Sequence, residues 1–391
     1  MDEDKIKYLI VVVSISTFAF WISSTMLRPV FPLYLSYIGF TEFEIGIVLS
    51  IPQLLSIFLR VPLSSKAREV GRVRFLTMAM ALNTLALFLY CLATSDKLVV
   101  VLARLVHTLP IAAFGPVAMA YVSIISPERR RGGIMGVYLS SVGLSVFLGP
   151  LITSGLTTVM DIRSVFLVAA LPTLLCIFLL FRVSGEDVDV LNGDGGGVNI
   201  VEGLRHLWRN KGFVLICISA LLYSSSMGFF RSFFPLFLES RYLIGAGIIS
   251  LLYSVRGFTN VLSRPISGFL SDRIGVGIMV VGGLLITSLM LFILSLRPPL
   301  EAVALVMAIY GAAWGVRAVS SINFIGFYLS DEDKEMGMAI FYNMFDIGVT
   351  LGSVTGGALL SMFPYEDVFL IYSGIVFLAA IVTVPLILKG L

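Results

Sequence analysis

Arg28-Pro-Val-Phe-Pro-Leu-Tyr-Leu35, near the end of the first long apolar segment, returns later in the chain as Arg231-Ser-Phe-Phe-Pro-Leu-Phe-Leu238. A second pair, Leu148-Gly149, returns as Leu351-Gly352, and both motifs are displaced by the same 203 residues. A fixed displacement over such distances indicates internal duplication. The 391 residues are therefore expected to form two related halves.

The composition places these halves in a lipid bilayer. Hydrophobic residues make up 58% of the chain and charged residues only 13%, which is more apolar surface than a soluble fold could bury. Apolar runs of roughly 20 residues, each able to cross about 30 Å of hydrocarbon as a helix, recur along the chain. They predict twelve transmembrane helices, at residues 8–35, 44–63, 74–94, 98–124, 133–160, 163–183, 212–238, 246–268, 275–296, 300–328, 337–362 and 367–388.

Basic residues collect at every second loop and predict the orientation. The positive-inside rule assigns these loops to the cytoplasm, so both termini are expected to be cytoplasmic in a protein of the cell membrane. The clusters are Lys66, Arg68, Arg72 and Arg74, then Arg129, Arg130 and Arg131, then Arg182, Arg205, Arg209 and Lys211.

A polar stretch separates the two halves. It contains Gly193-Asp194-Gly195-Gly196-Gly197, a composition typical of a flexible linker. The sequence therefore predicts an N-terminal six-helix bundle over 1–183, a cytoplasmic linker over 184–211 and a C-terminal six-helix bundle over 212–391. Duplicated membrane proteins of this kind often carry one ligand site on the pseudo-symmetry axis.

The loop after the eighth predicted span reads Gly268-Phe-Leu-Ser-Asp272-Arg273-Ile-Gly275. It resembles the G-x-L-x-D-R-x-G loop of the major facilitator superfamily of secondary transporters, and the resemblance extends over nearly the whole chain. Membership implies an all-α membrane protein with two pseudo-symmetric six-helix bundles and alternating access to a central site. It also implies that Gly268, Asp272 and Arg273 belong to a cytoplasmic gate.

The equivalent loop of the first half departs from that pattern. Aligned through Gly71, it has Ser64, Arg68 and Glu69 where the family has Gly, Asp and Arg. The acidic run that begins at Asp331 could compensate for this reversal of charge. We therefore expect Arg68 to meet the Asp331 cluster when the cytoplasmic side is closed, an exposed contact worth about 1 kcal/mol per pair.

Two further segments resemble the drug-proton antiporter branch of the family. Arg104-Leu-Val-His107-Thr108 is similar to R-x-x-Q-G, and residues 136–154 are similar to the fifth-span exporter pattern, with small residues in place of some glycines. The resemblance implies efflux in exchange for protons, with Arg104 taking part in proton transfer. Close helix packing alone would also explain the small residues.

Ionisable residues at membrane depth are costly and usually face a bundle interior or an aqueous cavity. Arg104, Arg256 and Arg317 lie near mid-span, and the repeat-related Arg28 and Arg231 lie toward the outer side. This excess of positive charge favours an anionic or partly anionic ligand. Snorkelling to the interface is the alternative for Arg28 and Arg231.

Proton coupling needs a group that changes its charge near neutral pH. His107 and Asp346 are the candidates, because histidine titrates near pH 6.5 and burial raises the pKa of a carboxyl group. A hydrogen-bonded structural His107 and an Asp346 locked to an arginine remain open alternatives. Tyr138 and Asn343 are candidate polar contacts for the substrate, although such residues often pack helices together.

The chain contains no HExxH motif and no phosphate-binding loop, so neither a zinc enzyme nor an ATP-driven pump is indicated. No cofactor, metal or nucleic acid is expected. The sequence predicts a monomeric, non-enzymatic transporter that exports small amphipathic molecules, driven by proton entry. The alternative is an organic-anion or organophosphate antiporter, because Arg28 and Arg231 resemble the paired arginines of that branch.

Overall fold

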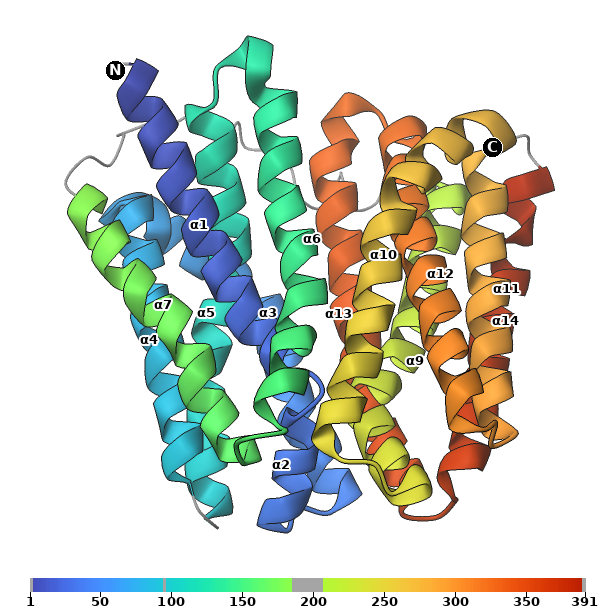
Figure 1. Cartoon of the computed structure of the whole chain (residues 1–391). Helices are drawn as coiled ribbons and strands as arrows, with labels where there is room; N and C mark the ends of the chain where they lie inside the picture. The colour runs from blue at the N-terminus through green and yellow to red at the C-terminus, as the bar shows by residue number, and fades with distance from the viewer. Residues whose placement is uncertain (1–2, 94–95, 185–206, 389–391) are drawn as a thin grey trace. The chain divides into compact units, whose positions relative to one another are not determined.

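The computed structural model describes residues 3–93, 96–184 and 207–388, and these residues contain helices but no β-strand. Twelve of the helices are 20 residues or longer, and a short helix follows the first of them (Figure 1). In chain order they are α1 (Glu3–Leu27), α2 (Phe31–Ile38), α3 (Glu42–Val70), α4 (Arg72–Leu92), α5 (Lys97–Ile125), α6 (Arg131–Leu156), α7 (Ile162–Val183), α9 (Lys211–Tyr242), α10 (Ala246–Ile274), α11 (Val276–Ser295), α12 (Leu300–Tyr328), α13 (Asp331–Leu360) and α14 (Tyr365–Leu388).

The long helices have the dimensions of membrane spans. In the described part of the chain, ten are both long and apolar enough to cross a bilayer. The other two, α10 and α13, are 29 and 30 residues long and carry more polar side chains. Helices satisfy every backbone donor and acceptor internally, which hydrocarbon requires.

Several helices extend beyond the apolar runs that predicted them. The second expected span ended at residue 63 and the eighth at 268, whereas α3 continues to Val70 and α10 to Ile274. Charged and serine residues continue a helix outside the bilayer, so hydropathy marks the membrane and not the helix end. Gly71 and Gly275 then precede α4 and α11 as N-cap residues with φ of 98° and 92°, a conformation that favours glycine.

The first predicted span is broken, and its repeat is not. Residues 8–35 were expected as one helix, but α1 ends at Leu27 and α2 begins at Phe31, whereas α9 is continuous through Arg231. Both repeats contain the later proline, at Pro32 and Pro235. Only the first has Pro29, where the second has Ser232. Pro29 lacks an N–H and its ring clashes with the preceding turn, which accounts for the break.

Short polar side chains begin three of the helices. Asp96 accepts a hydrogen bond from the Leu98 N–H at 2.8 Å, and Asn210 caps α9 in a similar way. Asp161 accepts from both the backbone N–H and the hydroxyl of Ser164, at 3.0 and 2.8 Å. These bonds stabilise the carboxylate and lower the pKa of Asp161.

The chain divides into two compact units. Unit 1 comprises Met1–Thr41, Ile51–Gly193 and Ile244–Ser254; unit 2 comprises Glu42–Ser50, Asp194–Leu243 and Val255–Leu391. The first turns of α3 therefore pack in unit 2, where a Cβ on Gly46 would overlap the Ser353 carbonyl. The expected linker over 184–211 stays a prediction, because 185–206 lie outside the described residues.

The core of unit 1 forms between α1, α4, α5, α6 and α7. Fully buried Leu76 and Met80 of α4 pack there with Phe20 of α1, Phe114 of α5 and Leu180 of α7. Each of these helices therefore turns one apolar stripe toward the interior. Other apolar residues of these helices are exposed, including Leu92, Leu102 and Phe178, as lipid-facing surfaces require.

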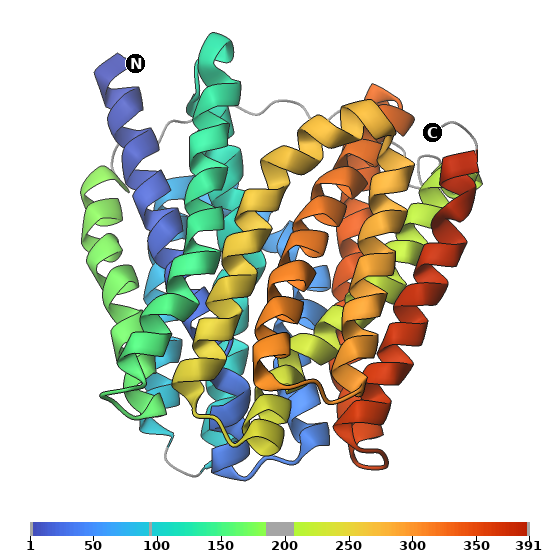
Figure 2. The ribbon, with the colours of Figure 1, turned by 45° about the vertical axis from the view of Figure 1, so that its right-hand side comes forward.

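The core of unit 2 is aromatic. Phe229 of α9 stacks on Tyr372 of α14 with ring centroids 4.5 Å apart, and Phe230 stacks on Tyr310 of α12 at 4.6 Å. Helix α11 packs against both α12 and α14 (Figure 2). Helix α9 meets α13 so closely that a Cβ on Gly352 would overlap the backbone of Ser225, so this crossing requires glycine.

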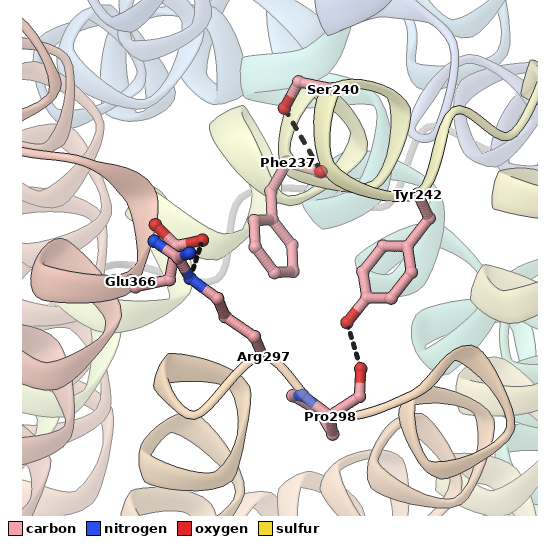
Figure 3. A network of polar contacts seen from close by, with 6 residues as sticks. All are labelled: Phe237, Ser240, Tyr242, Arg297, Pro298 and Glu366. Atoms are coloured by element: carbon pink, nitrogen blue, oxygen red, sulfur yellow. Dashed lines mark hydrogen bonds and ion pairs between the residues drawn. The ribbon is translucent and has the colours of Figure 1, made fainter.

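One end of unit 2 is tied by polar contacts (Figure 3). Arg297, in the turn between α11 and α12, forms an ion pair with Glu366 of α14, with Nε 2.7 Å from Oε1. The Tyr242 hydroxyl, at the end of α9, donates a hydrogen bond to the Pro298 carbonyl at 2.5 Å. The turn after α11 is thus held to two other helices.

Candidate substrate and proton sites

Unit 1 contains a buried polar network around Arg104 and His107 of α5. The Arg104 side chain is 8% exposed, and its Cζ lies 4.8 Å from the centroid of the Phe31 ring. Tyr90 of α4 interacts electrostatically with Arg104 and lies edge-on to the His107 ring. The structure therefore brings together both residues of the motif that resembled R-x-x-Q-G.

Both ring nitrogens of His107 have partners. Nε2 lies 3.0 Å from the Asn83 side-chain oxygen, and Nδ1 lies 3.3 Å from the Tyr90 hydroxyl. A neutral imidazole with its proton on Nε2 satisfies both contacts, because Tyr90 can then donate to Nδ1. The nearby Arg104 guanidinium further disfavours a second positive charge. The geometry suits a structural histidine in this conformation.

Unit 2 contains a second buried arginine site. Arg256 of α10 is 5% exposed and lies among three aromatic rings. Its Cζ is 5.4 Å from the centroid of Phe230, 5.3 Å from that of Tyr310 and 5.0 Å from that of Trp314. Aromatic faces attract a guanidinium through their quadrupoles, so the rings partly replace the lost hydration.

Arg317 lies one turn beyond Trp314 on α12. Its Cζ is 3.7 Å from the centroid of the Tyr223 ring of α9, and its Nη1 is 3.4 Å from the Ser321 hydroxyl. The Arg317 side chain is only 3% exposed. The prediction placed Arg317 among the substrate-binding residues, and the structure places it in a buried, aromatic environment.

The other predicted substrate residues lie in different surroundings. Arg28 is partly buried at the break between α1 and α2, and Arg231 is partly buried within α9. Tyr138 is buried in the core of unit 1, where its hydroxyl accepts a 3.4 Å hydrogen bond from Thr17. Asn343 is partly buried on α13. Tyr138 thus has a packing role as well as any contact with a ligand.

Asp346 is partly buried near the middle of α13, and its backbone carbonyl accepts a hydrogen bond from the Thr350 hydroxyl. Of the predicted gate residues, Gly268 lies within α10, and the exposed Arg273 guanidinium lies over the Phe269 ring. Arg68 is exposed at the end of α3. The side chains of Asp272 and Asp331 lie outside the part that the structure describes.

Sequence reasoning did not select Tyr223 or Tyr310. One signal was present, because Tyr310, Trp314, Arg317 and Ser321 follow one another at helical spacing and share a face of α12. Tyr223 gave no such signal. It is 94 positions away from Arg317, and only the packing of α9 on α12 brings the two side chains together.

The fold and its buried charges define the class. Two related sets of membrane helices contain buried arginines beside aromatic rings, an organisation that a membrane transporter can use. The family model described as Major Facilitator Superfamily matches residues 13–243 and 216–389. The chain belongs to this superfamily and is a transporter, not an enzyme. The predicted family and its all-α transmembrane fold are confirmed.

Relatives match along almost their entire length. An uncharacterised MFS-type transporter of Methanocaldococcus jannaschii is 20% identical over 389 residues, covering 95% of this chain and 98% of the relative. Multidrug resistance protein MdtG of Escherichia coli is 26% identical over 372 residues, covering 91% and 89%. The solved structure of a mutant nucleoside transporter NupG gives a TM-score of 0.81 at 14% identity, covering 96% and 99%.

Proposed function

We propose that the protein exports small amphipathic molecules across the cell membrane in exchange for protons. The observation that carries this proposal is the pairing of buried arginines with aromatic rings, around Arg104 in unit 1 and around Arg256 and Arg317 in unit 2. Flat aromatic rings can bind the apolar part of many different substrates, and a fixed charge can orient the polar end of the substrate. The similarity to the multidrug resistance protein MdtG supports the same activity.

The proposed mechanism is alternating access by a monomer whose halves, 1–183 and 212–391, move as bodies joined by 184–211. Both termini and the basic loops are assigned to the cytoplasm. Gly268, Asp272 and Arg273, in the last turns of α10, form the proposed inner gate. Arg68 and Asp331 are proposed to attract each other when that gate closes.

Asp346 is the proposed proton carrier. A carboxyl group on a membrane helix favours its protonated form when its surroundings exclude water, and it can release the proton when water reaches it. Arg104 is proposed to tune this exchange through its fixed charge, because arginine itself does not release a proton. His107 is the second candidate, but its two hydrogen bonds satisfy the neutral ring and favour Asp346.

The test is proton movement in liposomes that contain the purified protein and an internal pH dye. Anionic, neutral and cationic amphiphiles are added without an imposed gradient. We expect substrate-evoked proton movement that is lost in Asp346→Asn and largely kept in His107→Asn. Unchanged movement in Asp346→Asn would contradict the assignment of Asp346. Absence of proton movement with any substrate that is transported would contradict proton exchange.

A second candidate function is antiport of organic anions or phosphate esters. The repeat-related Arg28 and Arg231 favour it, because a symmetric pair of cations suits an anion. In that case an anion is transported without proton movement, and the activity is lost in Arg28→Gln or Arg231→Gln. A hydrophobic-drug exporter would lose little activity in either variant.

A further inference from the structure

We propose that unit 2 by itself binds the anionic group of an aromatic carboxylate on Arg317 and Arg256, which lie against Tyr223 and Tyr310, with Trp314 as the stacking surface. The inference rests on the proposed transport function and names the chemical class of one of its substrates.

Arg317 has hydrogen-bonding capacity that the described part of the protein does not use. Its Nε is buried and has no hydrogen-bond partner among the described residues. Nη1 lies 3.4 Å from the Ser321 hydroxyl, and the Tyr223 hydroxyl also interacts with the guanidinium. No described carboxylate forms an ion pair with it, and the Tyr223 ring covers one face of the guanidinium. A buried cation in this state is suited to receive an anion.

The internal repeat shows that helix packing does not need this arginine. Helix α12 is displaced from α5 by 203 residues at both ends, so Arg317 corresponds to Phe114, and Tyr223 corresponds to Phe20. In unit 1 the two phenylalanine rings stack, with centroids 4.2 Å apart and an interplanar angle of 17°. The same crossing therefore packs well without charge. A buried guanidinium is a less stable choice, and packing alone does not account for it.

Arg256 brings a second cation to the same two tyrosines. Its Cζ lies 5.3 Å from the Tyr310 centroid, and Tyr223 interacts electrostatically with both Arg256 and Arg317. Tyr310 likewise interacts with Arg317. Two guanidinium groups and two phenol rings thus form one cluster between α9, α10 and α12. Its positive charge is concentrated on one pair of rings.

The cluster suggests the form of its ligand. A guanidinium binds a carboxylate through two parallel hydrogen bonds, which matches the planar fork that Arg317 leaves partly unused. Trp314 lies one turn from Arg317 on the same face of α12 and is only partly buried. Its indole offers a ring on which an aromatic substrate can stack. A planar aromatic acid satisfies both features.

The experiment measures binding of three matched probes to the purified protein in detergent by calorimetry. The probes are 1-naphthoate, 1-naphthalenemethanol and 1-naphthylmethylammonium, which share a ring system and differ in charge. We expect naphthoate to bind at least tenfold more tightly than the alcohol. Tyr223→Phe/Arg317→Phe, which copies the pair of unit 1, should lose this preference, whereas Arg317→Lys should retain part of it.

Arg182→Gln is the matched control, because Arg182 is exposed at the end of α7. The inference is overturned if naphthoate fails to bind, if the double variant keeps the preference, or if Arg182→Gln loses it. If naphthoate shows no preference while a cationic probe evokes proton movement independently of Arg317, the anion site is overturned and proton-coupled export stands. A naphthoate preference that depends on Arg317, without any coupled proton movement, would support the site and refute proton coupling.

Discussion

Copying the Phe20–Phe114 pair into unit 2 should stabilise the protein. In the double variant Tyr223→Phe/Arg317→Phe, a phenyl ring replaces the buried guanidinium, which lacks a described carboxylate partner, and Tyr223 loses its hydroxyl. The two rings can then stack as Phe20 and Phe114 do. Replacing buried ionic groups with well-packed apolar ones commonly stabilises a protein by about 1–4 kcal/mol. A cation–π contact worth about 2 kcal/mol is lost, so we expect a gain near the lower end of that range.

The native cysteines provide the assay. Cys176 and Cys217 are buried and free, so a thiol-reactive dye reports unfolding when heat exposes them. The melting temperature of the double variant should exceed that of the native protein. The reciprocal change in unit 1, Phe20→Tyr/Phe114→Arg, should lower it, because it buries a charge in an apolar core.

A lower melting temperature in the unit 2 double variant would refute the reasoning. It would mean that Arg317 stabilises the fold through contacts that two rings cannot replace. If the reciprocal variant Phe20→Tyr/Phe114→Arg did not lower the melting temperature, both helix crossings would accommodate a buried arginine equally well. In that case the comparison between the repeats would carry no functional meaning.

Two further predictions concern packing in unit 2 and use the same melting assay. Gly352→Ala should destabilise the protein by about 1–3 kcal/mol, because the new methyl group overlaps the Ser225 backbone, whereas Gly374→Ala meets no atom within 4 Å and should be neutral or slightly stabilising. Glu366→Gln removes the ion pair to Arg297; the Glu366 side chain is 13% exposed, but that of Arg297 is 51% exposed and solvent weakens the attraction, so the cost should stay at about 1 kcal/mol. A larger loss would show that this contact contributes more than an exposed ion pair does.

Much of the fold was predictable because its main constraint is local. Each membrane helix must be apolar over a fixed length, so hydropathy locates it without knowledge of its neighbours. The break after Leu27 was less obvious, although Pro29 is visible in the sequence and absent from the second repeat. The predicted span at residues 8–35 continued across Pro29 because a continuous apolar run does not show whether it forms one helix or two.

The charged residues of the candidate site could be predicted from the sequence, but the residues that pack against them could not. Arg104 and Arg317 stand out because an arginine at membrane depth is rare in any sequence. Their environments depend on which way each helix faces, and several rotations of a largely apolar helix look similar in sequence. Tyr138 was selected for its hydroxyl and proved to be a core residue, whereas Tyr223 was overlooked and packs on Arg317.

The sequence by itself determined that this is a duplicated, membrane-spanning helical chain of the transporter class. Repeated motifs and the lengths of apolar segments can be recognised in the sequence without any knowledge of three-dimensional contacts. Only the tertiary structure decided that the equivalent helix crossings differ, with two stacked phenylalanines in unit 1 and an arginine on a tyrosine in unit 2. The physical reason is that these pairs join residues 94 positions apart, and their contact depends on helix rotation and packing.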